Sequence, residues 1–230
     1  MNQRQEALLG QVIKEYLHSA VPIGSKTLEN KSHLGLSSAT IRNALAELEE
    51  LGYIVQPHTS AGRIPTCLGY QYFLDNQLKN LGKITAKEEQ DLKQLAQKWQ
   101  NEPLELLIRN LARKLADLSN NAIVVGFADN SFYYTGLANL FSQPEFQDPS
   151  CVYDLSLIID HLDQVMNRLF NEVTQATVKI GAKNPFGQQC SVVLINWRFK
   201  KQSGLLGILG PVRMDYEKNL GLVNFIREQI

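Results

Sequence analysis

Residues 37–43, with the sequence SSATIRN, carry the side chains of this chain best suited to reading DNA bases. Small and polar residues at the start of a helix let that helix approach base edges closely in the major groove. An arginine can bind the O6 and N7 atoms of guanine together, and an asparagine can bind N6 and N7 of adenine. The segment therefore predicts a base-reading helix, whose expected contact residues are Ser37, Ser38, Thr40, Arg42 and Asn43.

Two further groups of polar residues are suited to the phosphate backbone. One is Ser25, Lys26 and Thr27 at the start of a short predicted helix, where unpaired backbone N–H groups favour an anion. The other is the polar loop 57–62 together with Arg63, which is expected to reach a phosphate or the minor groove as the chain leaves the loop. Within the loop, the expected contact residues are His58, Thr59 and Ser60.

The order of the predicted elements favours a winged helix-turn-helix, a fold that places one helix in the major groove of DNA. A short helix over residues 25–30, a turn containing a glycine and a longer helix over 37–51 come first. Strands at 53–56 and 63–65 then form a hairpin with a small, polar tip.

Each of these residues taken alone also has a plainer interpretation. The serines could serve only as helix caps, and Arg42 and Asn43 could lie on a solvated helix face. The residues point to DNA because they occur together and in this order. Winged helices also dock other proteins, so that alternative stays open.

Apolar spacing supports the predicted helices and supplies their buried faces. A first helix is expected over residues 4–19, and Thr66 is expected to cap a helix after the hairpin. In the helix after Ser37, the expected inward positions are Ile41, Ala44, Leu45, Leu48 and Leu51. After Thr66, they are Leu68, Tyr72 and Phe73.

The remainder of the chain alternates helices and strands. Residues 80–84 resemble a linker, a capping box at 85–88 begins a helix to about residue 99, and a second helix runs from 103 to about 119. Strands are expected at 122–127, 132–135, 176–180, 191–199 and 205–209, and helices at 152–170 and 216–229. The order predicts an α+β fold with a partly antiparallel sheet. The expected domains are a winged helix (1–80), a helical connector (81–120) and an α+β domain (121–230).

Composition excludes several classes of protein. The chain has zero net charge, and residues 1–80 hold seven basic and seven acidic side chains, so a DNA-binding face must come from where the charges lie. Three distant cysteines fit a reducing cytoplasm, and neither they nor the four histidines have the spacing of a metal site. No apolar run is long enough to cross a membrane, and no signal-peptide core is expected. No cofactor and no catalytic residues are expected, because no nucleophile or acid–base arrangement occurs.

The run QPHTSAGRIPT at residues 56–66, followed by Gly69-Tyr70, resembles one family closely, the HrcA heat-inducible transcription repressors of bacteria. The run is specific, because generic winged helices do not share it. VPIGSKTL at 21–28 and LGLSSATIRN at 34–43 resemble the family as well. Further similar stretches lie at residues 136–140, 144–146, 180–181, 184–186, 190–191 and 206–216.

The resemblance implies a winged helix followed by a GAF-like domain, which family members interrupt with an inserted dimerisation domain. It implies repression of chaperone operons by a homodimer bound to double-stranded DNA at the CIRCE inverted repeat, with the GroEL chaperonin as a partner. Family members are considerably longer, so this chain is expected to be a shortened member with a reduced GAF-like domain. A regulator whose second domain senses a small metabolite is the alternative.

The absence of the inserted domain raises the question of how the chain dimerises. The connector helices at 86–119 are one candidate interface, because their apolar residues exceed what packing one helix pair requires. The alternative is that these helices only cover the second domain. The residues concerned are Leu92, Leu95, Leu104, Leu107, Ile108 and Leu111.

Overall fold

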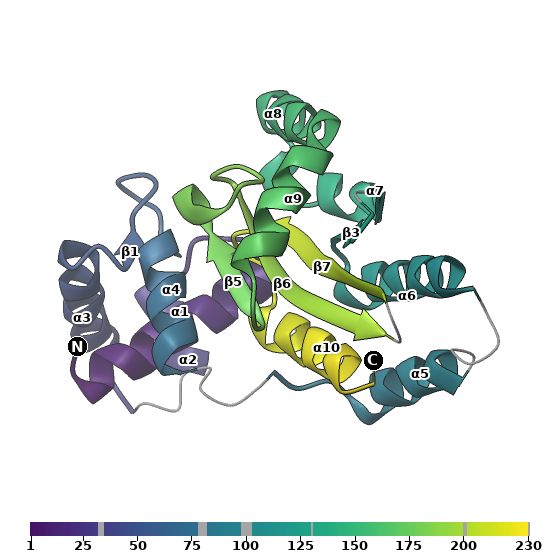
Figure 1. Ribbon diagram of the computed structural model, residues 1–230. Coiled ribbons are helices and arrows are strands. Elements are labelled where there is room, and N and C mark those ends of the chain that lie inside the picture. Colours follow the sequence, from purple (N-terminus) through teal and green to yellow (C-terminus); the bar gives the residue numbers. More distant parts are fainter. Residues whose placement is uncertain (32–34, 78–81, 98–102, 130, 200–201, 230) are drawn as a thin grey trace. The chain divides into compact units, whose positions relative to one another are not determined.

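The computed structural model describes residues 1–31, 35–77, 82–97, 103–129, 131–199 and 202–229 (Figure 1). By its internal contacts the chain divides into two compact units, Met1–Asn80 and Leu81–Ile230. The predicted turn at 33–36, the linker at 80–84 and the helix end near residue 99 fall partly or wholly outside the described residues.

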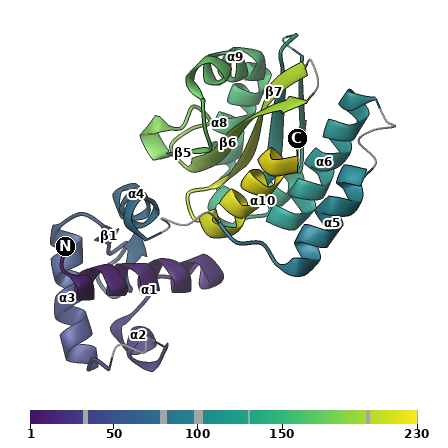
Figure 2. The same ribbon diagram turned by 60° about the horizontal axis from the view of Figure 1, so that its bottom comes forward.

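The first unit consists of four helices and a small hairpin (Figure 2). Strands β1 and β2 pair antiparallel, with Ile54 opposite Pro65 and Val55 opposite Ile64. A bridge between Ile23 and Arg63 extends the hairpin toward the start of α2. The helices and strands are α1 (Gln3–Ser19), α2 (Ser25–Lys31), α3 (Ser38–Glu50), β1 (Ile54–Val55), β2 (Ile64–Pro65) and α4 (Cys67–Asn76).

Local signals set the ends of these helices, as the sequence predicts. The Ser37 side chain caps α3, and Gly52 follows that helix with a φ of +77°, a left-handed conformation that costs glycine little. The Thr66 side chain caps α4 in the same way. The helices enclose one apolar core, formed mainly by Leu8, Leu9, Val12, Ile13, Leu28, Ile41, Leu45, Leu48, Ile54 and Tyr70.

Two predicted core residues are exposed. Leu51 is 50% exposed because it lies at the C-cap of α3, after the last residue that shares the buried face. Leu68 is 53% exposed, and Tyr70, which is 1% exposed, takes the inward position on α4.

The second unit is built on a five-stranded sheet with the order β4-β3-β7-β6-β5. Every neighbouring pair is antiparallel, whereas the sequence predicted a partly antiparallel sheet. The strands are β3 (Ala122–Phe127), β4 (Phe132–Thr135), β5 (Thr177–Ile180), β6 (Cys190–Phe199) and β7 (Gln202–Pro211).

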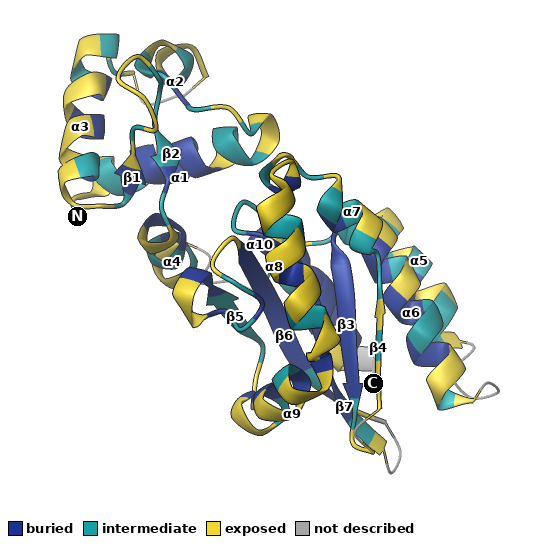
Figure 3. Ribbon diagram, turned by 90° about the horizontal axis from the view of Figure 1, so that it is seen from above, coloured by how far each residue is buried: buried dark blue, intermediate teal, exposed yellow. Residues whose placement is uncertain are grey.

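Helices cover both faces of this sheet, so the unit has three layers, and β3, β6 and β7 are buried between them (Figure 3). One face carries α6 (Leu104–Ser119) and α10 (Tyr216–Gln229), with α5 (Ala86–Ala96) against α6. The other face carries α7, α8 and α9. Their bounds, with those of two short 3-10 helices, are α7 (Leu137–Phe141), η2 (Pro144–Phe146), α8 (Pro149–Asp160), α9 (Leu162–Glu172) and η3 (Gly181–Lys183).

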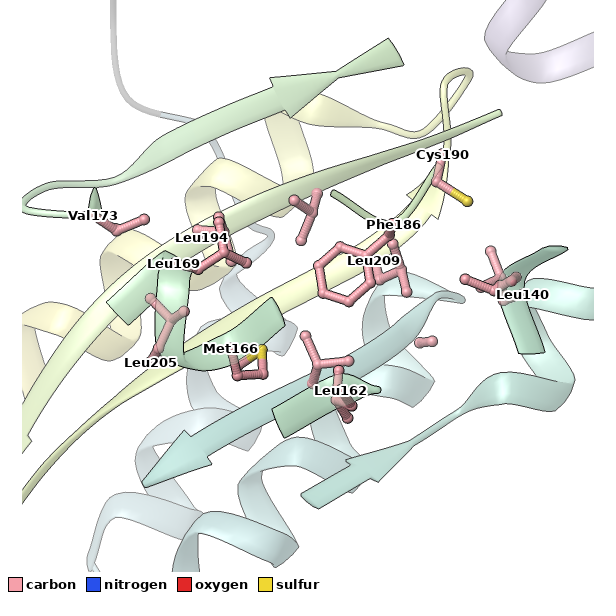
Figure 4. Packing of buried hydrophobic residues seen from close by; sticks show 14 of the residues in the cluster. Leu140, Leu162, Met166, Leu169, Val173, Phe186, Cys190, Leu194, Leu205 and Leu209 are labelled. Carbon is pink, nitrogen blue, oxygen red and sulfur yellow. The ribbon is translucent and has the colours of Figure 1, made fainter. Parts of the chain in front are cut away.

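The core under α9 is a continuous apolar cluster (Figure 4). Leu162, Met166 and Leu169 of α9 pack toward strand residues such as Leu194 and Leu205. Full burial of such side chains is worth roughly 1.5–3 kcal/mol each.

The prediction of a single helix over residues 152–170 is wrong. The chain forms α8 and α9 instead, because His161 between them adopts a φ of −114° and a ψ of 28°. Leu155 before the break and Leu162 after it are both buried in the cluster. The apolar spacing therefore continues across a point where the helical backbone is interrupted.

The two predicted connector helices belong to the second unit as part of its core. Leu92 on α5 and Leu107, Ile108 and Leu111 on α6 are at most 2% exposed within the single chain. These four residues are used within the unit, where α6 covers the sheet and α5 packs on α6, whereas Leu95 and Leu104 are half-buried. This burial favours the alternative that the sequence left open, in which the helices cover the second domain.

Gly69 is expected to be intolerant of a side chain, because a Cβ there would lie 2.1 Å from the Tyr53 carbonyl oxygen. Alanine normally stabilises a helix interior relative to glycine. Gly69→Ala should instead lower the free energy of unfolding of the first unit by about 1–3 kcal/mol, as overpacking does. Amide hydrogen exchange of α1 and α4 in the full chain measures the change.

Gly24→Ala is the matched control, because no atom lies within 4 Å of a Cβ at that position. We expect it to cost less than about 1 kcal/mol. Equal protection of amides in the two variants would contradict this account of Gly69.

Candidate nucleic-acid interface

The first turn of α3 is fastened to α2. The Ser38 N–H donates to Glu29 Oε1 at 2.9 Å, and the Ser25 and Ser38 hydroxyls lie 2.9 Å apart. The Thr40 N–H donates to Ser37 Oγ at 3.3 Å. These bonds fix α3 relative to α2, and Gly35 between the helices adopts a φ of +63°. Ser25, Ser37 and Ser38 therefore stabilise the turn between α2 and α3 through these hydrogen bonds, independently of any contact with a ligand.

The outward face of α3 carries the residues predicted to read bases. Arg42 and Asn43 are exposed, as are Ala39 and Ala46 beside them. The small alanines leave the helix backbone accessible around the two long polar side chains. Ser38 and Thr40 are half-buried at the first turn, and Ser37 is exposed at the cap.

A hollow of about 420 Å³ lies between the start of α2, α3 and the hairpin loop; we call it the hairpin-side hollow. It brings together half of the predicted contact residues, from three separate parts of the sequence. Those lining it are Ser25, Lys26, Arg42, Thr59, Ser60 and Arg63. Those outside it are Thr27, Ser37, Ser38, Thr40, Asn43 and His58.

The hairpin loop is shaped by Gln56, a residue that sequence reasoning did not single out. Its Nε2 atom donates to the carbonyl oxygens of Thr59 at 3.0 Å and of Ala61 at 2.9 Å. The Gln56 N–H donates to Glu49 Oε1 at 2.9 Å, so the loop is also attached to α3.

Arg63 also has a structural role within the unit, which the sequence did not predict. Its Nε atom donates to Glu49 Oε2 at 2.8 Å, and its side chain is 19% exposed. Its backbone exchanges two hydrogen bonds with Ile23. Arg63 therefore holds the hairpin against α3 and α2, and only part of its guanidinium faces the hollow. Contact with DNA stays a prediction for this residue.

The hairpin-side hollow carries positive charge, because Lys26, Arg42 and Arg63 line it and no acidic side chain of the described residues does. Acidic side chains elsewhere in the unit have partners there. Glu15 pairs with Lys31, and Glu6 accepts from the Tyr72 hydroxyl at 2.5 Å, a bond that raises the pKa of Tyr72 to about 12. Lys26 and Arg42 are exposed, and within the described residues neither has a carboxylate at ion-pair distance. The hollow can therefore attract an anion although the unit's charges balance.

Two charged residues of the second unit, Arg213 and Asp215, make contacts that stabilise its fold. Arg213 binds the Glu145 carboxylate through Nε at 2.6 Å and Nη2 at 3.2 Å. Asp215 accepts the Lys218 N–H at 2.9 Å and so caps α10. Burial raises the pKa of the Cys190 thiol to about 12, which disfavours a reactive thiolate.

The described residues contain neither a metal-binding cluster nor a membrane-spanning helix. No group of three or more His, Cys, Asp or Glu side chains within them could hold a metal ion. Among the helices in that part of the chain, none is long and apolar enough to cross a bilayer.

Comparison with known proteins finds one family model and several relatives of similar sequence. Residues 71–220 match the family model of the HrcA protein C terminal domain. The heat-inducible transcription repressor HrcA of Brevibacillus brevis is 27% identical over 330 residues, covering 99% of this chain and 96% of the relative. That of Chlorobium phaeobacteroides is 28% identical over 342 residues, covering 100% and 97%.

A solved structure supports the fold. The crystal structure of a hypothetical protein aligns with a TM-score of 0.73 at 18% identity, covering 100% of this chain and 96% of the other.

Arg63→Ala and Lys26→Ala are both expected to weaken duplex binding, and Arg63→Ala is also expected to lower stability because it releases the hairpin from Glu49. Each removes one positive charge from the hollow, so each should weaken binding to all sequences and reduce the salt slope by about one. Only Arg63→Ala leaves a half-buried Glu49 unpaired, which should cost about 1 kcal/mol of stability.

Salt titrations of duplex binding and thermal unfolding of the full chain measure the two effects. Loss of affinity at a single base position in Arg63→Ala would show that Arg63 reads sequence. Equal unfolding temperatures of the two variants would contradict the proposal that the ion pair between Arg63 and Glu49 fastens the hairpin to α3.

Proposed function

Because the chain belongs to the HrcA family of heat-inducible transcription repressors, we propose that its first unit is a winged helix that binds the CIRCE inverted repeat of chaperone operons. In this proposal α3 is the recognition helix and the hairpin is the wing. The family consists of transcription repressors, so the chain is a regulator and not an enzyme.

The hairpin-side hollow is the observation that carries this proposal. Six predicted contact residues from α2, α3 and the hairpin line one concave surface. Arg42 and Lys26 bring unpaired positive charge to it, and Arg42 and Asn43 project from the exposed face of α3. Phosphate contacts supply most non-specific affinity, and side chains on the helix face supply the choice of sequence.

We propose further that the second unit is a reduced GAF-like domain of a shortened family member. Its five antiparallel strands between two helical layers support the first part. The alignment with the Brevibacillus brevis repressor spans 330 residues, whereas this chain has 230, which supports the second part. The metabolite-sensing alternative lacks a specific supporting observation in the described residues.

The partners follow from the operator and the family. An inverted repeat presents two half-sites, so we propose a homodimer that places one α3 in each. We also propose the GroEL chaperonin as a partner and the bacterial cytoplasm as the compartment, because the operator lies on chromosomal DNA. The DNA contacts proposed beyond the hollow are those of Thr27, Ser37, Ser38, Thr40, Asn43 and His58.

The test of the proposal is binding of the full chain to a CIRCE duplex. Arg42→Ala should weaken binding to that duplex by about 1–3 kcal/mol if Arg42 contacts a base. Binding to an unrelated duplex should fall much less. The fold should survive, because Arg42 lies opposite the buried face of α3. Fluorescence anisotropy with both duplexes measures the difference.

Circular dichroism controls for folding of the Arg42→Ala variant. Full operator affinity in a folded variant would mean that α3 does not meet the bases through Arg42. Failure of the wild-type chain to distinguish CIRCE from an unrelated duplex would overturn the proposed operator.

Dimerisation is expected although the usual inserted domain is absent. One winged helix alone buries only roughly 600–1,000 Å² on DNA, which is small for tight specific binding. Light scattering at micromolar concentration, with and without operator, should therefore detect a dimer. A strict monomer that stays monomeric on the operator would contradict the proposed symmetric complex.

A further inference from the structure

We infer that Arg4, at the start of α1, binds a DNA phosphate on the flank of α3 that faces away from the hairpin. This inference rests on the proposed function and extends the binding surface to a helix that sequence reasoning left out of it. The surface would then contact the phosphate backbone on both sides of the recognition helix.

A second hollow, of about 340 Å³, supports this placement. It lies between the first turn of α1, with Asn2, Arg4 and Gln5, and the α3 residues Thr40, Asn43 and Glu47. Asn43 lines this α1-side hollow, whereas Arg42 lines the hairpin-side hollow. Neighbouring residues of α3 thus point to different hollows.

Helix geometry places the two hollows on opposite flanks of α3. Residues advance by about 100° around a helix. Arg42 and Leu45 of the hairpin-side hollow therefore point about 140–160° away from Thr40 and Glu47 of the α1-side hollow. The exposed face of α3 lies between these directions. If that face enters the major groove, the two hollows face the two phosphate backbones that border the groove.

Arg4 is held in position with most of its hydrogen-bonding capacity free. Its Nη2 atom donates to the Thr40 carbonyl oxygen at 3.4 Å, and the residue is exposed. An arginine has five N–H donors. In the described part of the chain, no carboxylate lies at ion-pair distance from its guanidinium. The contact with Thr40 orients the group beside the first turn of α3 while leaving its charge available.

Most other polar groups around this hollow are already paired, and Asn43, the exception, carries no charge, which singles out Arg4 as the group for an anion. Asn2 and Gln5 form a reciprocal capping box at the start of α1, so the helix terminus itself is occupied. Glu47 Oε2 accepts from Gln5 Nε2 at 2.9 Å. The Glu47 carboxylate repels a phosphate at its own end of the hollow, so the anion is expected at the end formed by Arg4 and Thr40.

Arg4→Ala in the full chain tests the inference, with Lys14→Ala as the control. Lys14 is also an exposed basic residue of α1, ten residues from Arg4, which is roughly 15 Å along the helix. Arg4→Ala should weaken binding to CIRCE and to an unrelated duplex by the same factor, roughly three- to tenfold, and reduce the salt slope by about one. Lys14→Ala should change neither quantity.

Arg4→Lys separates a phosphate contact from a structural role. Lysine keeps the charge, so this variant should recover most of the lost affinity. Loss of affinity that Arg4→Lys does not restore, together with a lower unfolding temperature, would show that Arg4 only supports α3. A change confined to one base pair would show that Arg4 reads a base, which also overturns the phosphate assignment.

The outcomes distinguish this inference from the proposed function. If operator binding by the wild-type chain depends on Arg42, and Arg4→Ala binds DNA as tightly as Lys14→Ala, only the role of Arg4 is overturned. A wild-type chain that binds neither duplex overturns the proposed function and this inference with it.

Discussion

The Glu49 carboxylate is the interaction on which the candidate interface depends. One oxygen accepts the Gln56 N–H from the first strand of the hairpin, and the other accepts Arg63 Nε from the second. Glu49 belongs to α3, so a single side chain fastens both strands of the hairpin to that helix. Together with the Ile23–Arg63 bridge, Glu49 therefore fixes the position of the hairpin loop relative to Arg42. An acidic residue, which a DNA phosphate would repel, therefore helps to shape the surface proposed to bind DNA.

The same arrangement explains how a chain of zero net charge can present a positive surface. Near α3, Arg63 neutralises the charge of Glu49. Glu29 and Glu47 keep their charge, because they accept hydrogen bonds only from the neutral Ser38 N–H and Gln5 amide, but they do not line the hairpin-side hollow. Lys26 and Arg42 have no carboxylate partner among the described residues. The charge that a ligand meets is therefore set by pairing and position, and the overall composition is a poor guide to it.

Local signals in the sequence predict most of the fold, and pairings between distant residues account for what they miss. The caps Ser37, Thr66 and Thr85 act within three residues, so their motifs can be read directly. The break at His161 leaves the apolar spacing intact, so periodicity predicts one helix where there are two. The partner of Arg63 lies fourteen residues away on another element, and the flank occupied by Arg4 depends on how α1 packs. Neither contact can be predicted from the sequence alone.

The sheet of the second unit also has a consequence for how the chain reaches its native state. β3 is apolar along its whole length and buried between β4 and β7, yet β7 follows only after α7, α8, α9, β5 and β6 have been made. Strands so far apart in the sequence can pair only after a long loop has closed, which slows folding. Until then, the edge of β3 that pairs with β7 stays exposed. Exposed apolar strands are what makes folding intermediates aggregate and what chaperones protect. The order of strands therefore leaves one edge of β3 open to aggregation until β7 has been made.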